Sequence, residues 1–335
     1  MKKYLLSIFT IVSAFASAQN PQFAVVRPDG TTYICPTFDS AHNKAVDDDW
    51  IYLPGTVISG DKTITKRLTI IGAGHYPDST QYTGKTHFTN SLFLEKKCTL
   101  EGIQVDNQIV ITNPAANNCS FIRLKTSLII LGGTNDHFID GSVFYTITGA
   151  NYNNSSCTQS LNIFVRNSFL NSIEKLMYSN FSNCVFLGNT GGFTFFKIAN
   201  SQFDNCIFRG LFTADWYFQT VCYPIVGNSS NHCLWYNSAA FPGINNLSTS
   251  QPDTVMVSSG NNGTFFDYQY NYHLKPNSPY LTAGSGGTEI GVYGGNAPYK
   301  EGAVPSNPHI YFRQVSTQTN ASGQLPVQFK VRTTN

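Results

Sequence analysis

The chain has 335 residues and a formal net charge of +2, and 12% of its residues are charged while 14% are aromatic. The lack of a basic excess argues against a nucleic-acid partner, and a hydrophobic fraction of 41% excludes a disordered chain. The length suits one large domain or two, and a solenoid can grow this long around one continuous core.

The first 18 residues have the pattern of a secretory signal peptide. Lys2 and Lys3 form a basic start, an apolar run follows over residues 4–14, and residues 16–18 (Ala-Ser-Ala) form a cleavage site. The apolar run is shorter than a membrane-spanning helix. Cleavage leaves 19 basic residues (21 − 2) against 19 acidic ones. The pattern predicts a protein that is secreted or held at the cell surface, with the periplasm as the alternative, and that does not span a membrane.

The stretch from Asp39 to Gly74 predicts how the fold begins. A helix is expected near residues 38–46, because its apolar side chains fall on one helical face and Thr37 or Asp39 can cap its start. Strands are expected at Trp50–Gly55 and Leu68–Gly74. This order resembles the opening of right-handed parallel β-helix proteins, the pectate-lyase-like superfold, in which a small helix covers the open end of the coil. The resemblance implies an all-β solenoid with an N-terminal capping helix.

A repeat that starts at residue 98 supports the solenoid. Seven blocks share a small residue, Cys or Ser, and a large apolar residue two positions later, at separations of about 22 residues. The small residues are Cys98, Cys119, Ser142, Ser168, Cys184, Cys206 and Cys233, and the large ones are Leu100, Phe121, Phe144, Leu170, Phe186, Phe208 and Trp235. Because side chains alternate along a strand, both positions face the same way. We expect one inward column of each kind, within a coil that extends from about residue 50 to about residue 295.

The residue before the small position predicts a sharp turn into each strand. It is Asn or Gly in five blocks: Asn118, Gly141, Asn167, Asn183 and Asn205. Both residue types tolerate the left-handed backbone conformation, so we expect left-handed turns and a ladder of stacked asparagines, which is typical of the family that the chain resembles. The gap from Ser168 to Cys184 is the shortest and is the weakest point of this alignment.

Beyond Asn271 the pattern changes. Residues 272–295 resemble the segment that ends many bacterial β-helix proteins, and alternating runs at Ile310–Val315 and Val327–Arg332 predict a β-hairpin. A hairpin alone is marginal, so we expect it to lie against the last coils. The expected organisation is a signal peptide (1–18), a β-helix domain with its cap (19–300), and a C-terminal linker and hairpin (301–335).

Eight cysteines in an exported protein suggest disulfides, but the repeat favours free thiols. Neighbouring rungs lie about 4.8 Å apart, whereas a relaxed disulfide brings the Cβ atoms to about 3.8 Å. Ser replaces Cys in two blocks, as expected of a slot for a small side chain. Cys35, Cys157 and Cys222 lie outside the repeat, and the sequence leaves their pairing open.

The sequence predicts no catalytic residue, metal site or cofactor. Residues 134–137 (Thr-Asn-Asp-His) offer an acid and a base, but a polar turn is the simpler interpretation. The three aspartates at 47–49 are interpreted as a solvated turn after the cap helix. Asp140 and Asp204 share a repeat position, but two blocks separate them, which exceeds the roughly 5–9.5 Å of a glycosidase pair. No Cys-x-x-Cys or His-x-x-x-His spacing indicates a metal.

Aromatic residues in a departure from the repeat, residues 211–223, predict a ligand site. Asp215, Trp216, Tyr217 and Tyr223 lie there, and exposed rings beside polar groups can stack on sugars. Packing of this loop on the coil is the alternative interpretation.

These observations favour an exported, non-enzymatic β-helix protein of the cell envelope or surface that binds a polysaccharide or surface glycan. Two alternatives stay open: a polysaccharide lyase or glycoside hydrolase of the pectate-lyase-like type, and a purely structural or adhesive spacer. An exposed groove with Asp, Lys and Arg on adjacent rungs would favour the enzyme. An aromatic platform without titratable neighbours would favour binding. The oligomeric state is not predicted.

Overall fold

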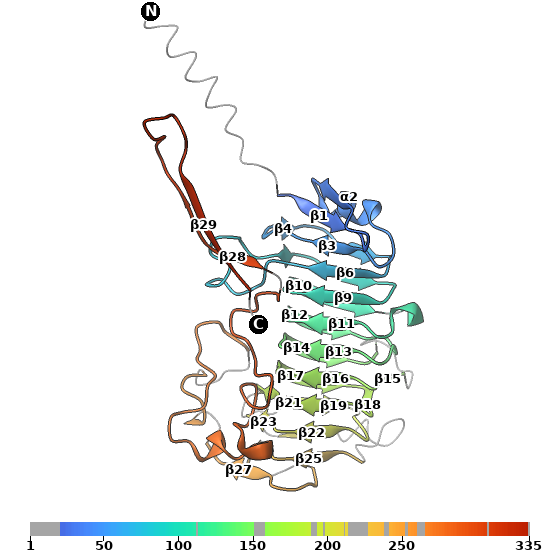
Figure 1. Ribbon diagram of the computed structural model, residues 1–335. Helices are drawn as coiled ribbons and strands as arrows, with labels where there is room; N and C mark the ends of the chain where they lie inside the picture. Colours follow the sequence, from blue (N-terminus) through green and yellow to red (C-terminus); the bar gives the residue numbers. More distant parts are fainter. Residues whose placement is uncertain are drawn as a thin grey trace, which may run out of the picture.

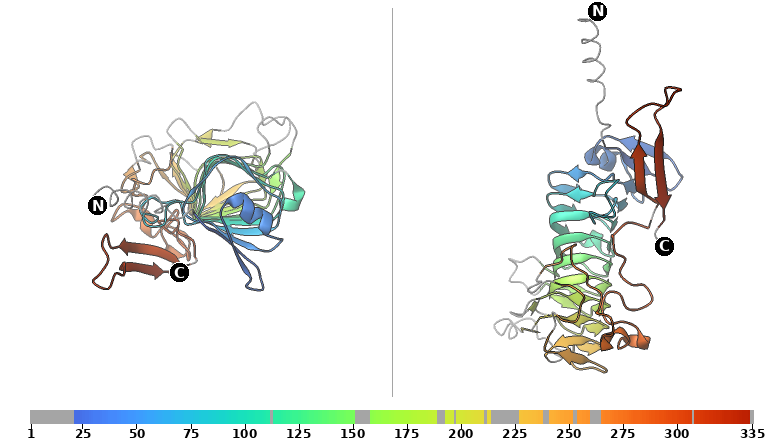
Figure 2. Two further views of the ribbon diagram at one scale, coloured as in Figure 1. Left: turned by 90° about the horizontal axis from the view of Figure 1, so that it is seen from above. Right: turned by 90° about the vertical axis from the view of Figure 1, so that its left-hand side faces the viewer.

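The structure, a computed structural model, describes residues 21–111, 113–150, 158–188, 193–196, 198–210, 212–213, 227–237, 241–251, 254–259, 265–306 and 308–333. It is a right-handed parallel β-helix, as predicted, in which the strands of successive coils stack into two long sheets (Figures 1 and 2). A short helix, α2 (Phe38–Lys44), covers the first coil, and an antiparallel hairpin follows the β-helix.

Sheet A is the face turned toward the viewer in Figure 1. Its strands, in stacking order, are β2 (Thr32–Cys35), β1 (Phe23–Val26), β3 (Trp50–Tyr52), β6 (Leu68–Ile71), β9 (Cys98–Glu101), β11 (Ser120–Ile122), β13 (Phe138–Asp140), β16 (Phe164–Arg166), β19 (Asn180–Ser182), β22 (Gln202–Asp204) and β25 (Ser229–Asn231). From β3 onward neighbouring strands are parallel, whereas β1 is antiparallel to both β2 and β3.

Sheet B forms a second wall of the coil. Its main strands, in stacking order, are β4 (Val57–Ile58), β7 (His87–Phe88), β10 (Gln104–Ile111), β12 (Lys125–Ile130), β14 (Val143–Thr148), β17 (Phe169–Glu174), β20 (Val185–Phe186), β23 (Ile207–Phe208), β26 (Leu234–Tyr236) and β27 (Leu247–Thr249). Attached to it are β5 (Lys62–Ile64), β8 (Leu92–Leu94), β21 (Phe193–Phe196) and β24 (Phe212–Thr213). Strands β15 (Ser160–Leu161) and β18 (Leu176–Met177) pair separately, and short 3-10 turns occur at Pro114–Ala116, Pro279–Leu281 and Ser285–Gly287.

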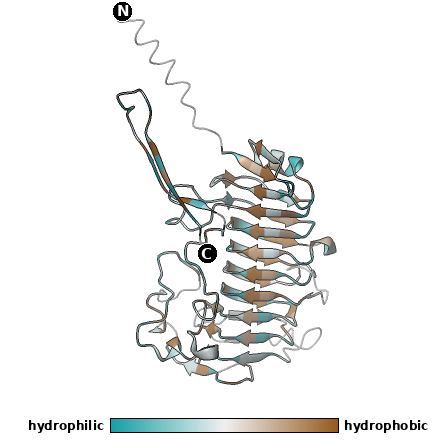
Figure 3. Cartoon of the chain, in the orientation of Figure 1, coloured by the Kyte–Doolittle hydropathy of each residue, from teal (hydrophilic) through white to brown (hydrophobic). Residues whose placement is uncertain are grey.

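Large apolar side chains from both sheets fill the coil in inward columns. Sheet A contributes Ile51, Ile70, Leu100, Phe121, Ile139, Val165, Phe181 and Phe203, and sheet B contributes Val105, Phe144, Leu170, Phe186, Phe208 and Trp235, all of them buried. The ring of Phe208 stacks 4.7 Å from Phe186 and 3.8 Å from Trp235. Hydrophobic colour follows the strands in Figure 3, whereas the turns between them are more hydrophilic.

The small residues form two columns, and the expected single column is wrong. Cys98 and Cys119 enter strands of sheet A, whereas Ser142, Ser168, Cys184, Cys206 and Cys233 enter strands of sheet B. Each coil contains one strand of sheet A and one of sheet B, only a few residues apart. The spacing between successive blocks therefore stayed near one turn where the repeat passed from sheet A to sheet B, and did not reveal the change. The register across Ser168 and Cys184 is correct, since Leu170 pairs with Phe186.

The predicted left-handed turns are confirmed. The five residues Asn118, Gly141, Asn167, Asn183 and Asn205 have φ values between 49° and 60°. His232, which departs from the Asn or Gly rule, adopts the same conformation with φ 50°. The Nδ2 group of Asn205 donates to Oδ1 of Asn183, which is one step of the expected ladder, but Asn167 donates instead to Asp140.

The N-terminal cap combines α2 with antiparallel strands. Thr37 caps the helix: its side chain accepts a hydrogen bond from the Ser40 N–H, and the Ser40 side chain accepts one from the Thr37 N–H. Phe38 packs edge-on against Phe88 of the first coils, with ring centroids 5.3 Å apart. Strands β1 and β2 were not expected, and they cover the open edge of sheet A.

The solvated turn expected at residues 47–49 is wrong for Asp49. This side chain is fully buried and accepts a hydrogen bond from the Val46 N–H at 2.8 Å. Asp47 accepts from the Arg67 N–H, and Asp48 forms an ion pair with the Arg67 side chain. Asp47 and Asp48 therefore join the cap to the first coil, while Asp49 closes the turn after the helix.

The coil ends at β27, earlier than the expected residue 295. The described residues between 254 and 306 instead run along the outer face of sheet B, where they appear orange to red in Figure 1. The predicted hairpin is confirmed as β28 (His309–Val315) and β29 (Val327–Arg332). It lies beside the first coils and not the last, since the Phe312 ring is 5.9 Å from that of Tyr82.

The six described cysteines, Cys35, Cys98, Cys119, Cys184, Cys206 and Cys233, are buried free thiols, while Cys157 and Cys222 lie outside the described residues. Burial raises the pKa of Cys98 to about 12 and that of Cys119 to about 11. We expect these six thiols to react with Ellman's reagent at neutral pH only after denaturation, with mass spectrometry locating each label. Rapid labelling of any of the six in the folded protein would contradict this expectation.

Candidate functional site

The outer face of sheet B carries a second hydrophobic core. Its outward row contains Val143, Phe169, Val185, Ile207 and Leu234, and the C-terminal segment covers them with Val255, Met256, Tyr272, Leu274, Ile290, Val292 and Tyr299. The Phe169 ring lies 4.7 Å from Tyr272 and 5.1 Å from Tyr299. This part of the face is therefore closed to a ligand.

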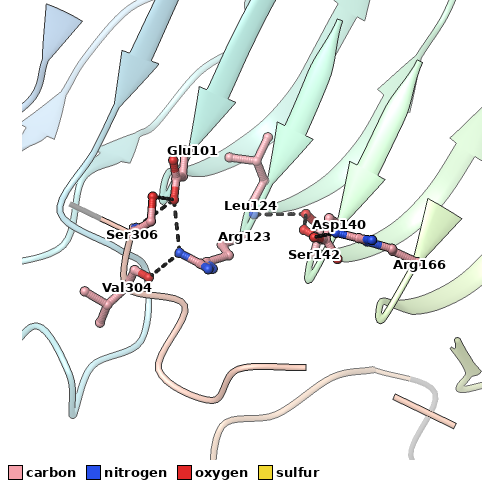
Figure 4. A network of polar contacts seen from close by, with 8 residues as sticks. All are labelled: Glu101, Arg123, Leu124, Asp140, Ser142, Arg166, Val304 and Ser306. Carbon is pink, nitrogen blue, oxygen red and sulfur yellow. Dashed lines mark hydrogen bonds and ion pairs between the residues drawn. The ribbon is translucent and has the colours of Figure 1, made fainter. Parts of the chain in front are cut away.

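A nearly buried ion pair anchors the end of the C-terminal segment to the coil (Figure 4). The Glu101 carboxylate accepts hydrogen bonds from Arg123 Nη1 at 3.0 Å and from the Ser306 N–H at 2.9 Å. Arg123 also donates to the Val304 carbonyl at 2.9 Å. The side chains of Glu101 and Arg123 are 10% and 14% exposed. Residues 304–306 are thus held against the β9 and β11 coils.

Toward the first coils, the outward row of sheet B becomes polar. Lys125 of β12 stands in register with Val143, and Gln104 of β10 stands in register with Lys125. The pairing of β10 with β12 shifts between Val105 and Gln108, and this irregularity includes Asp106. Charged residues on an otherwise apolar row indicate that this part of the face meets solvent or a ligand.

A groove of about 130 Å³ opens at this polar end. Its polar lining residues are Gln104, Asp106, Lys125, Thr126, Ser127 and Asn171. One wall consists of Tyr145 from β14 and Phe265 from the C-terminal segment, whose rings stack at 5.2 Å with an interplanar angle of 17°. Tyr145 is 45% exposed and Phe265 is 62% exposed. Two segments far apart in sequence therefore form the groove together.

Asp106 is the carboxylate of this lining, and it is already bonded within the protein. Its oxygens lie 2.7 Å from Nε2 of His87 and 2.8 Å from Nε2 of Gln104. Partial burial acts to raise the pKa of Asp106, but the hydrogen bonds from Gln104 and His87 outweigh it, so that the pKa lies below its ordinary value. The group is ionised at neutral pH and serves as a hydrogen-bond acceptor.

Lys125 places a cation on the rung next to Asp106. Burial lowers its pKa, and the nearby ammonium of Lys85 acts in the same direction. The Lys125 Nζ atom lies 4.2 Å from the centroid of the Tyr268 ring, so an aromatic face stabilises part of its charge.

A buried histidine holds Tyr268 behind Lys125. The Tyr268 hydroxyl lies 3.0 Å from Nδ1 of His75 and donates to the His75 carbonyl at 3.1 Å. Complete burial lowers the pKa of His75 to about 3, so the ring is neutral and its Nδ1–H donates to the tyrosine oxygen. The Tyr76 ring packs edge-on against Tyr268 at 4.6 Å. An aromatic cluster therefore lies behind Lys125.

The predicted site residues Asp215, Trp216, Tyr217 and Tyr223 lie outside the described residues. The cluster at 134–137 has a structural role. His137 is fully buried, accepts a hydrogen bond from the Cys119 N–H at 3.2 Å and lies 2.7 Å from the Thr134 hydroxyl. Burial lowers its pKa to about 4, so the ring is neutral and both of its nitrogens are used inside the coil.

The sequence analysis missed the groove residues Asp106, Lys125, Tyr145 and Phe265. A signal for Lys125 was present in the residue between the small and large positions. It is apolar in the five blocks of sheet B that form the covered row, from Val143 to Leu234. Lys125 and Gln104 continue this row in register toward the first coils, where it becomes polar. No comparable signal existed for Phe265, since its partner Tyr145 is remote in sequence.

Comparisons with protein-family models, with curated proteins and with solved structures found no match. Across the ranges that the structure describes, no helix has both the length and the hydropathy of a membrane span. The same residues contain no group of three or more His, Cys, Asp or Glu side chains placed to share a metal ion.

Proposed function

We propose that this protein is an exported, non-enzymatic β-helix protein of the cell envelope or surface, of the pectate-lyase-like type, that binds a glycan in the sheet B groove. The exposed aromatic pair Tyr145 and Phe265 carries the proposal, since an aromatic face that opens beside hydrogen-bonding groups suits the apolar face and hydroxyls of a sugar. The signal-peptide pattern of residues 1–18 supports export. Asp106, Ser127 and Lys125 supply acceptors and donors at the rim of the aromatic pair.

A glycan array followed by titration calorimetry on the best oligosaccharide tests this proposal. We expect Tyr145→Ala to weaken binding about tenfold or more, equivalent to about 1.4 kcal/mol, because it removes the inner ring of the stack. The thermal midpoint should stay near that of the parent, since the side chain is half exposed. Tyr311→Ala on the hairpin, with a similarly exposed ring, is the matched control and should bind as the parent does.

The loop that contains Trp216 is the competing site for the same function. If Trp216→Ala abolishes binding while Tyr145→Ala leaves it intact, the groove is the wrong site and the loop is the right one. If no glycan binds the parent protein, the structural or adhesive spacer replaces this proposal.

One observation favours the enzyme alternative, a polysaccharide lyase or glycoside hydrolase. Lys125 has a lowered pKa and stands on the rung adjacent to Asp106, an arrangement in which an amine could act as a base. Against it, the described lining supplies one carboxylate, and that carboxylate is paired with His87. Formation of unsaturated products or new reducing ends from polysaccharides, lost in Lys125→Ala, would favour the enzyme.

A further inference from the structure

The C-terminal hairpin of β28 and β29 carries a row of apolar side chains that the described chain leaves exposed. Val327, Phe329 and Val331 alternate along β29, so their side chains point to one face of the hairpin. Their partners on β28 include Val315 and Ile310, which extend the row across both strands. Phe329 is 63% exposed, Val327 57% and Val331 48%. Contiguous apolar side chains with this exposure indicate an interaction surface.

The apolar row is turned away from the coil. Phe312 pairs with Lys330, which lies on the opposite face of β29 from Phe329. The ring of Phe312 lies 5.9 Å from that of Tyr82 in the first coils, so the face with Phe312 is the inner one. The hairpin stands beside the first coils, and its tip extends past their capped end (Figures 1 and 2). The outer face is therefore open to a large partner.

Charge is divided unevenly between the hairpin and the coil. Residues 302–335 contain three basic residues, Arg313, Lys330 and Arg332, and no acidic one. Residues 19–301 contain the other 16 basic residues (19 − 3) and all 19 acidic ones. The hairpin segment thus has a formal charge of +3, whereas residues 19–301 have −3 (16 − 19). An anionic partner is therefore attracted to the hairpin and repelled by the coil.

The three cations of the hairpin form no ion pair with a described carboxylate. Arg313 pairs with Phe329 across the hairpin, so it stands within the apolar row. Lys330 Nζ lies 5.3 Å from the centroid of the Phe312 ring, and the Arg332 guanidinium lies 5.1 Å from that of Tyr311. Aromatic faces stabilise these charges in part but neutralise none of them. The cations are therefore available to the anionic groups of a partner.

An apolar row beside unpaired cations fits the surface of an anionic bilayer. Headgroup phosphates attract Lys and Arg, while the boundary below them accepts apolar side chains. A polyanion without an apolar phase would leave the row around Phe329 in water. A second copy of the chain would cover that row, but it would bring two sets of three cations together, and like charges repel. The lipid surface is the partner that uses both features.

We propose that the hairpin docks the protein on the surface of a bilayer that contains anionic phospholipids. Phe329 and Val327 enter the boundary between headgroups and acyl chains, and Arg313 contacts headgroup phosphates from within the row. Lys330 and Arg332 add attraction from the inner face of the hairpin, which is one sheet thick. The hairpin lies on the bilayer surface and does not cross it. This docking face is separate from the groove on sheet B, so it does not depend on glycan binding.

Co-sedimentation with lipid vesicles tests the proposal. The protein is used after removal of residues 1–18, because the apolar run of that segment would itself bind lipid. We expect binding to vesicles of phosphatidylcholine with phosphatidylglycerol to be stronger by about fivefold or more than binding to phosphatidylcholine alone, and to weaken in molar salt. Phe329→Ser should reduce binding about tenfold and Arg313→Gln about fivefold. Phe164→Ser, which removes a phenylalanine that is 47% exposed on sheet A, should bind as the parent does.

A further variant separates loss of docking from local unfolding of the hairpin. Phe329→Trp keeps a large aromatic ring in the row and should bind as the parent does. Relative to the parent, its emission should shift to shorter wavelength with anionic vesicles and stay unchanged with phosphatidylcholine alone. An unshifted emission of the bound variant would show that the row stays in water, and would overturn the proposal.

Three other results would also overturn it. The first is a parent protein that does not sediment with anionic vesicles. The second is binding that Arg313→Gln reduces but Phe329→Ser does not, which would indicate a site for a polyanion without insertion into lipid. The third is a parent protein that forms a dimer by light scattering and becomes monomeric in Phe329→Ser, which would show that the row meets a second copy of the chain.

Discussion

Replacing Phe208 by Ala should lower the free energy of unfolding by about 3–5 kcal/mol, because it empties the centre of the stacked column. The Phe208 ring lies between Phe186 and Trp235, at centroid distances of 4.7 and 3.8 Å, and also contacts Phe203 at 5.6 Å. These four side chains are buried. Rigid neighbours from adjacent coils cannot close the cavity, so the loss should fall at the upper part of the range.

Equilibrium denaturation of both proteins, followed by tryptophan fluorescence and circular dichroism, measures this difference. Phe164→Ala is the control, since it deletes the same side chain from a position that is 47% exposed. We expect that control to change stability by less than about 1 kcal/mol. A Phe208→Ala protein as stable as the control would mean that the column does not form the core.

The second large effect is expected for Glu101→Ala, which should destabilise the protein by about 3 kcal/mol. Breaking a buried ion pair leaves the partner charge without compensation. Arg123 would keep its bond to the Val304 carbonyl but lose the carboxylate, and the Ser306 N–H would lose its acceptor. The C-terminal segment should then detach from the coil at residues 304–306.

Limited proteolysis and thermal denaturation measure the two consequences of this substitution. We expect faster cleavage near residues 300–308 and a lower midpoint, with Glu101→Gln intermediate because an amide can still accept hydrogen bonds. The control is Lys62→Ala, which removes the pair with Asp39, a residue whose side chain is 66% exposed, and which should cost less than about 1 kcal/mol. Equal effects of Glu101→Ala and Lys62→Ala would rule out the anchor.

Anchoring of the segment also bears on the candidate site. Phe265 and Tyr268 lie on the same returning segment and form one wall of the groove and its support. If Glu101→Ala loosens the segment as far as these residues, this variant should bind the glycan more weakly than the parent, as Tyr145→Ala is expected to do. The stability effect and the binding effect can be separated by working well below the thermal midpoint.

Much of the coil could be predicted because its determinants are local. An inward small residue, a large residue two positions later and a left-handed Asn or Gly before them lie within one strand and its turn, as at Asn183, Cys184 and Phe186. The capping box of Thr37 and Ser40 is equally local. Side-chain alternation and the conformational freedom of Asn and Gly act over a few residues, so the sequence pattern expresses them directly.

The sequence analysis expected one column of small residues where the structure has two. The residue that follows each small position would have separated them. The residue after the small position is Thr99 or Ser120 in the two blocks of sheet A, but apolar in the five blocks of sheet B. An outward hydroxyl is typical of a solvated face, and an outward Phe169 of a covered one. This difference separates the two sheets, and it also predicts that something must cover sheet B.

The sequence by itself therefore determined that the chain forms a parallel coil, which side chains fill it and that a hairpin follows. Only the tertiary structure decided what covers sheet B and where the groove opens. Tyr268 meets His75 across 193 residues and Arg123 meets Val304 across 181. Such contacts depend on the shape of two surfaces that the chain brings together after folding back, and no short-range periodicity encodes them.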